Sequence, residues 1–175
     1  MSESPSLKRP RFFPGKLVTP GDLELEQQYF RDKLKRHNRS LHGFGIVSGL
    51  KVSVNSGQIV VEPGLALDCE GNELAIETEQ SIVPPTNADC HTVFVNVRFF
   101  EAGADPVSSA EGQELSTITE SFELAFTQEN SNLGHRHLRA RWLACGRPHA
   151  LTVAKLRHSS QGWRVDRGYR VPVIK

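Results

Sequence analysis

Residues 11–52, RFFPGKLVTPGDLELEQQYFRDKLKRHNRSLHGFGIVSGLKV, decide the fold, because they hold one long helix and its entry into a β-rich remainder. Thr19 is the expected N-cap, a proline follows at the first helical position, and Asp22 completes a capping-box pair. Acidic residues come early in this segment and basic residues late, which is the order that the helix dipole favours. Gly43 is the expected C-terminal cap. The pattern therefore predicts a helix over residues 20–41.

The apolar residues of this helix follow one face, which we call the helix seam. The seam is narrow and is interrupted by two polar residues; it consists of Leu23, Gln27, Phe30, Leu34, His37 and Leu41, at alternating spacings of four and three. Such a seam can pack on the chain's own sheet or against another chain, and the spacing alone leaves both open. Leu25 and Tyr29 add a second apolar strip, and phenylalanines flank the helix, which favours assembly. The expected partner-docking residues are Phe12, Phe13, Leu23, Phe30, Leu34, Leu41 and Phe44.

The chain after residue 44 has the pattern of a β-rich body. Short strands are expected at 59–61, 65–67 and 74–76, longer strands at 92–100 and 116–127, and a late hairpin at 151–156 and 163–165. Loops are expected at 101–114, which is rich in small and acidic residues, and at 130–134. Residues 139–143 fit either a strand or a short helix. Strands at intervals of about 8–12 residues with turn signals between them are typical of a sandwich or barrel, so we expect a β-sandwich-like body.

The expected organisation is a single domain in three parts: an entry arm (1–18), a long helix (19–43) and the β-sandwich-like body (44–175). The fold class is therefore mainly β with one long N-terminal α-helix. A length of 175 residues suits one domain with its own core.

The composition excludes several classes of protein. The 21 basic and 20 acidic residues nearly cancel, so nucleic acid is not an expected partner. No apolar run approaches the ~20 residues of a membrane span, and no secretory signal is expected at the polar N-terminus. The three cysteines form no CxxC pair, which argues against a zinc knuckle or a redox dithiol. A cytoplasmic protein with reduced thiols is the expectation.

The strongest candidate for a metal site is the pair His135 and His137, since residues two apart on a strand point to the same face. No further ligand lies at a diagnostic spacing. A polar loop beside arginines is therefore the main interpretation, with a metal ringed by such pairs on a three-fold axis as the alternative. No cofactor is expected.

The sequence lacks the usual signatures of catalysis. GxSxG, HExxH and phosphate-binding glycine loops do not occur in it. Asp68 and Glu70 could pair as carboxylates, but carboxylates in turns are commonly solvated, and we expect no enzyme. Trp142, Trp163 and Tyr169 could stack on a sugar. A carbohydrate- or ligand-binding module of a tail fibre is therefore the alternative function.

Two stretches resemble proteins encoded with contractile injection systems and phage-tail-like particles. The first has the pattern F-x-G-K-L-V-T-x-x-D-L-x-x-E-Q-x-Y followed by H-N-R-x-L-H-G-x-G-x-V-x-G-L. Its matching residues are Phe13, Gly15, Lys16, Leu17, Thr19, Asp22, Leu23, Glu26, Gln27, Tyr29, His37, Asn38, Arg39, Leu41, His42, Gly43, Gly45, Val47, Gly49 and Leu50. The second, VEPGLALDCEGNELAI at 61–76, resembles a hairpin of tail and baseplate components. The chain is also loosely similar to the shell domain of the type VI secretion baseplate adaptor.

The resemblance covers roughly residues 11–76 and implies a structural or adaptor component of a baseplate. It implies a sandwich of the tail or receptor-binding-protein shell type, which docks to other baseplate or tail proteins through its N-terminal arm and helix. It also implies a homo-oligomer, with a trimer among the forms allowed, that works in the cytoplasm as part of an assembled particle.

Overall fold

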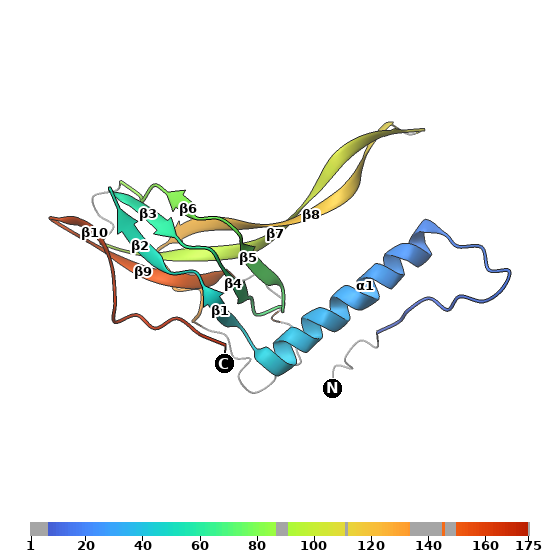
Figure 1. The fold of residues 1–175 in the computed structure, drawn as a ribbon, viewed down its shortest axis with the longest axis horizontal. Coiled ribbons are helices and arrows are strands. Elements are labelled where there is room, and N and C mark those ends of the chain that lie inside the picture. Colours follow the sequence, from blue (N-terminus) through green and yellow to red (C-terminus); the bar gives the residue numbers. More distant parts are fainter. Residues whose placement is uncertain (1–6, 87–90, 111, 134–144, 146–149, 175) are drawn as a thin grey trace.

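The computed structural model describes residues 7–86, 91–110, 112–133, 145 and 150–174. The fold is mainly β, with three sheets and one helical stretch of 23 residues near the N-terminus, as expected from the sequence. Figure 1 shows the sheets stacked as a body from which the helix and one long β-hairpin project. No helix in the described ranges combines the length and the apolar character that crossing a membrane requires.

The helix begins where its capping signals place it. α1 (Pro20–His37) starts at Thr19, whose Oγ1 accepts a hydrogen bond from the Asp22 backbone N–H at 3.2 Å. The Asp22 carboxylate in turn accepts one from the Thr19 N–H at 3.1 Å, so the predicted capping box is confirmed. The last turn, η1 (Asn38–His42), is π-helical and ends at Gly43, which has a φ of +83° as a C-terminal glycine commonly does.

Within the described ranges, ten strands form three antiparallel sheets. The first sheet contains β1 (Gly45–Gly49), β4 (Gly64–Leu67) and β5 (Glu73–Ile76), in the order β1-β4-β5. The second contains β2 (Val52–Asn55), β3 (Gln58–Val61) and β6 (Gln80–Ile82), in the order β2-β3-β6. The third contains β7 (Thr92–Ser109), β8 (Gly112–Thr127), β9 (Leu151–Ser159) and β10 (Gly162–Val165), in the order β10-β9-β7-β8. The predicted short strands and the late hairpin are confirmed.

The core lies between the four-stranded sheet and the two smaller sheets. Its buried members are Leu50, Ile59, Val61, Ala66, Leu74, Ile76, Val93, Val95, Val97, Leu151, Val153, Ala154 and Leu156. These are mostly β-branched or leucine side chains at alternate strand positions, which is the pattern of sheets with one buried face. The result is the sandwich-like arrangement that the strand spacing predicts.

The prediction of a loop at 101–114 is wrong. β7 and β8 stay paired from Phe94↔Thr127 out to Ser109↔Gly112, so this stretch forms the outer half of a long hairpin. The sequence shows no strand signal here, because a ribbon exposed on both faces does not need apolar residues at alternate positions. Besides the backbone pairing, the Ser116 hydroxyl donates to the Asp105 carbonyl at 2.7 Å, and the Thr117 hydroxyl donates to the Asp105 carboxylate at 2.5 Å.

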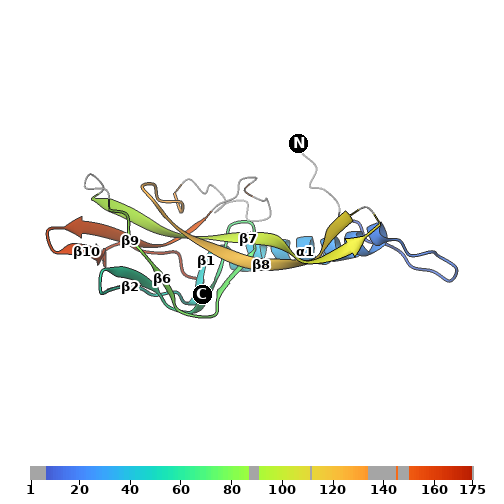
Figure 2. The ribbon, with the colours of Figure 1, turned by 90° about the horizontal axis from the view of Figure 1, so that it is seen from above.

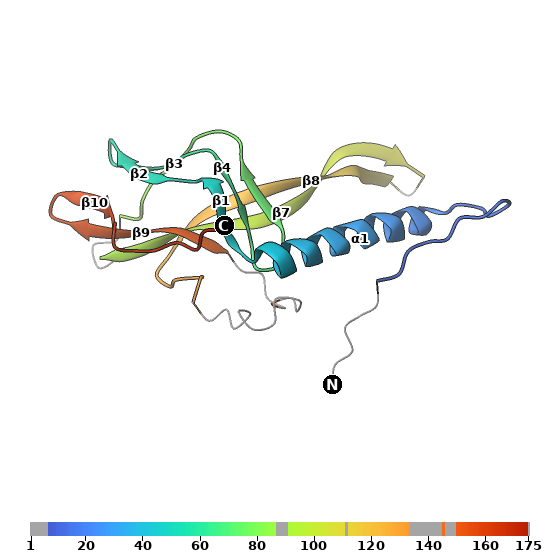
Figure 3. The same cartoon turned by 60° about the horizontal axis from the view of Figure 1, so that its bottom comes forward.

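The helix and the outer hairpin leave the body in the same direction. Figures 1 and 2 show α1 and the β7–β8 hairpin both extending away from the stacked sheets. Figure 3 shows the N-terminal arm turning back along α1 on the side away from the hairpin, so the helix lies between them. The helix therefore contributes no side chain to the core.

Candidate docking surface

The helix seam is open along its length. α1 has no buried residue, and the exposed fractions of Leu23, Phe30 and Leu34 are 54%, 55% and 52%. Leu41 is 64% exposed. Of the two arrangements that the periodicity allows, the chain's own sheet therefore does not cover the seam. A row of half-exposed apolar side chains on one helix face is a surface of the kind that binds another protein.

The N-terminal arm adds to this surface. Phe12, Phe13 and Leu17 are 50%, 57% and 84% exposed. Phe44 is different, because it packs partly buried against the core cluster. Of the expected docking residues that the structure describes, Phe44 is thus the one that packs against the core of its own chain.

Lys16 ties the arm to the start of the helix. Its Nζ lies 2.6 Å from the Asp22 carboxylate and 5.1 Å from the centre of the Phe12 ring. The hydrogen bond from Lys16, followed by those from Thr19, lowers the pKa of Asp22 to about 2. The Asp22 carboxylate therefore both pairs with Lys16 and caps the helix.

Acid is expected to loosen this end of the helix. Because the pKa of Asp22 in the folded chain lies below its ordinary value of 3.8, the stabilisation is complete above about pH 4 and is lost as the pH falls toward 2. Circular dichroism at 222 nm and amide exchange of residues 19–23 between pH 5 and 2 measure it. In Asp22→Asn the first turn should fray already at pH 5, without the further change on acidification. An identical acid response in both proteins would contradict this assignment.

The other end of the helix is fixed to the body at what we call the junction, where residues 35–39 meet the turn 68–72 between β4 and β5. The Asn38 Nδ2 donates to the Gly71 carbonyl at 3.0 Å, and the Arg39 Nη1 donates to the Glu70 carbonyl at 2.6 Å. Asn38 is buried, in contrast to the exposed residues of α1. The helix therefore projects from a defined point and at a defined angle.

The turn at the junction is organised by Asp68. Its carboxylate accepts hydrogen bonds from the backbone N–H groups of Glu70 and Asn72, each at 2.8 Å, and from the Asn72 Nδ2 at 2.7 Å. Asp68 is only 5% exposed, so the expectation of a solvated turn carboxylate is wrong. Sequence reasoning missed this role, although Asp-x-x-Gly is a frequent turn pattern.

Cys69 lies in the same turn and is a free thiol. Its burial, and then the neighbouring Cys145, raise the pKa of the Cys69 thiol above its ordinary value. A buried, protonated thiol is chemically unreactive.

The other sequence candidates are not assembled into a site by the described residues. His135, His137 and Trp142 lie outside the described ranges, as does the undecided segment 139–143. Within those ranges no group of three or more His, Cys, Asp or Glu is placed to hold a metal ion. Trp163 packs beside His158 at 4.8 Å between ring centres, and Tyr169 packs edge-on against Phe94. Both rings are engaged by their own chain.

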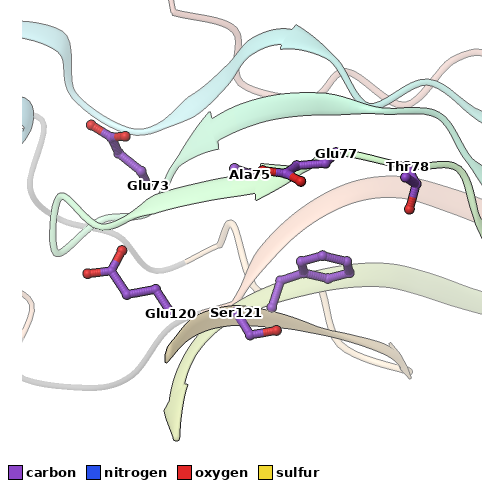
Figure 4. Close-up of a pocket in the computed structure, with 7 residues that line it drawn as sticks. Glu73, Ala75, Glu77, Thr78, Glu120 and Ser121 are labelled. Atoms are coloured by element: carbon purple, nitrogen blue, oxygen red, sulfur yellow. The ribbon is translucent and has the colours of Figure 1, made fainter. Parts of the chain in front are cut away.

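An acidic groove that the sequence did not reveal lies between β5 and β8. Figure 4 shows Glu73 and Glu77 on one side of it and Glu120 and Ser121 on the other. The groove has a volume of about 450 Å³. One signal could have found it: no lysine or arginine occurs between Arg98 and Arg136.

The fold is similar to solved baseplate proteins, whereas no protein-family model and no curated protein matches the sequence. A chain of the type VI secretion system TssK-TssF-TssG baseplate subcomplex matches 96% of this chain with a TM-score of 0.57 and 15% identity. The crystal structure of TssK matches 96% with a TM-score of 0.56 and 11% identity. A chain of the type VI secretion baseplate complex matches 95% with a TM-score of 0.54 and 16% identity.

These matches establish a shared fold. This chain spans 62%, 42% and 60% of the length of the three solved chains, so it corresponds to part of each. Two of the three similar structures are of type VI secretion baseplate complexes, and the third is of TssK.

Proposed function

We propose that this chain is a structural adaptor of a contractile injection system or phage-tail-like baseplate, and that it docks to other particle proteins through its N-terminal arm and helix. The observation that carries the proposal is the open helix seam on a fold shared with type VI secretion baseplate proteins. The adaptor works in the cytoplasm, assembled into the particle.

The junction explains why this helix is suited to docking. A single exposed helix of this length is only marginally stable by itself in water. Here the capping box fixes one end, and Asn38 and Arg39 fix the other to the turn 68–72. A partner therefore meets a helix whose direction is already set, which lowers the ordering cost of binding.

The partners follow from the same surface. One of the similar structures is a complex of TssK with TssF and TssG, all baseplate proteins. By analogy, the helix seam of this chain binds other baseplate proteins. Phe30 and Leu34 are the aromatic and aliphatic anchors of that contact, and Phe12 and Phe13 are the aromatic anchors of the arm.

The double variant Phe30→Ser/Leu34→Ser is expected to lose partner binding while keeping its fold. Buried apolar anchors at interfaces contribute about 2 kcal/mol or more each, so losing both should lower the affinity on the order of several hundredfold. The melting temperature should stay near that of the wild type, because both side chains are half exposed in the lone chain. Pull-down and calorimetry with the co-expressed baseplate proteins measure the two effects.

The matched control is Val83→Ser/Leu133→Ser, which changes two body residues that are 71% and 74% exposed. This control should bind the baseplate proteins as the wild type does. Unchanged binding of the Phe30/Leu34 variant would refute the proposed docking surface, and equal losses in both variants would show that it is not confined to the helix.

A further inference from the structure

The outer half of the β7–β8 hairpin is a second unpartnered surface, which we call the acidic ribbon (residues 100–110 and 112–121). It carries the exposed apolar residues Phe100, Val107, Leu115 and Ile118, at 45%, 48%, 60% and 63%. β8 is an edge strand of its sheet, whereas the edge strand β1 is covered by the Ile46–Val173 bridge to the C-terminal segment. A two-stranded ribbon with a bare edge is marginal in water, so another surface is expected to cover it.

The charge of the ribbon limits what that surface can be. Residues 100–121 include five acidic residues and no lysine, arginine or histidine. Glu101 and Glu120 stand directly opposite each other in the ladder, a like-charge pairing that destabilises a hairpin. Neither has an ion pair within the described part of the chain. Their repulsion is relieved if a cationic partner binds.

The acidic groove extends the negatively charged surface of the ribbon onto the body. Glu120 belongs to both surfaces, and Glu73 and Glu77 of the groove lie across from it (Figure 4). Glu73, Glu77 and Glu101 are all exposed. The ribbon and groove together therefore offer a run of carboxylates beside apolar side chains.

The N-terminal arm has the opposite character. Residues 7–18 include four basic residues and no acidic one, and Lys16 alone of these forms an ion pair in the described structure. Lys8, Arg9 and Arg11 are exposed beside Phe12 and Phe13. The arm thus presents cations beside exposed aromatic rings, and the ribbon presents carboxylates beside exposed apolar side chains. The two surfaces are complementary in charge, and both offer apolar contacts.

The arm does not reach the ribbon of its own chain. α1 lies between the two (Figures 1 and 3), and no ion pair joins them among the described residues. Arg9 instead lies 5.9 Å from the ring centre of Tyr29 on the helix. The complementary surfaces of one chain are therefore free to meet only between two copies.

We infer that the acidic ribbon of one copy binds the basic arm of a second copy. This inference rests on the proposed function, which assigns the arm a role in docking. It adds that the partner of the arm is a second copy of this chain. The helix seam is left for the other baseplate proteins. The contact is heterologous, because the arm and the ribbon are different surfaces. Repeated from copy to copy it closes a ring, or two copies bind each other's ribbons with their arms.

A charge-reversal experiment tests the inference on the full chain. By light scattering and analytical ultracentrifugation, the wild type should exceed monomer mass at low salt and dissociate as salt is added. Arg9→Glu/Arg11→Glu and Glu101→Lys/Glu120→Lys should each weaken self-association at least tenfold. An equimolar mixture of the two variants should associate again, because the unchanged acidic ribbon of the arm variant then meets the unchanged basic arm of the ribbon variant.

The control Glu62→Lys/Glu129→Lys makes the same change of net charge as the ribbon variant Glu101→Lys/Glu120→Lys, but at exposed sites elsewhere on the body. It should associate as the wild type does. A wild type that is monomeric at every salt concentration, or a mixture that does not re-associate, would overturn the inference. Both charge-reversed proteins should still bind baseplate proteins through Phe30 and Leu34. Loss of that binding in Phe30→Ser/Leu34→Ser, with self-association kept, would separate the two surfaces.

Discussion

The Asp68→Ala variant is expected to unfold about 6–12 °C below the wild type. The substitution removes the acceptor for two backbone N–H groups and the Asn72 amide, in a turn where Asp68 is 5% exposed. Each buried donor left without a partner costs about 1–3 kcal/mol, so a total on the order of 3 kcal/mol is expected. For a chain of this size, 1 kcal/mol corresponds to about 2–4 °C. Thermal and urea denaturation measure the change.

Glu70→Ala is the matched control for Asp68→Ala. Glu70 lies two residues away in the same turn, and its backbone carbonyl, not its carboxylate, accepts the hydrogen bond from Arg39. The control should therefore unfold within about 0.5 kcal/mol of the wild type, the usual range for surface changes. If Asp68→Ala is as mild as Glu70→Ala, the Asp68 carboxylate does not organise the junction.

The Gly71→Ala variant is expected to detach the helix from the body. Gly71 has a φ of +90°, and an added Cβ would lie 2.2 Å from the carbonyl oxygen of Lys35. The backbone conformation alone costs about 1–2 kcal/mol for alanine. The clash adds to this cost, because the helix backbone must move away and break the bonds of Asn38 and Arg39 to the turn. Trypsin should then cleave after Lys35, Arg36 or Arg39 at least about tenfold faster.

Gly57→Ala separates the two causes. Gly57 has a φ of +80°, close to that of Gly71, but no atom lies within 4 Å of the Cβ that alanine would add. This control should lose stability through backbone strain alone, and its tryptic cleavage in the helix should not change. Equal cleavage of the two variants would show that the contact between Gly71 and Lys35 does not hold the helix.

The sequence predicted those parts of the fold that local chemistry determines. Thr19 and Asp22 specify the helix start by themselves, because a capping box needs only residues three apart. The short strands could be read because one face of each packs in the core, as the buried Ile59, Val61 and Leu74 show. Local pattern and tertiary packing agree in these segments.

The parts that could not be predicted depend on contacts between distant segments. Nothing near Asp68 in sequence indicates that its turn receives the end of a helix thirty residues earlier, through Asn38 and Gly71. The ribbon was assigned to a loop because period-two alternation appears only where one strand face is buried. Whether the helix seam would be covered was equally undecidable, since the same spacing serves both an internal and an external partner.

The central claim is that the helix seam is open on the lone chain and is covered by another protein in the assembly. Amide hydrogen exchange of residues 23–34 tests this claim most directly. In the wild-type chain alone these amides should exchange much faster than those of residues 93–97, the buried part of β7, since no residue of α1 is buried. On addition of the co-expressed baseplate proteins, exchange in this segment should slow at least about tenfold, while β7 is unaffected. Slow exchange of the helix in a lone, monodisperse monomer, or exchange that the baseplate proteins leave unchanged, would contradict the account.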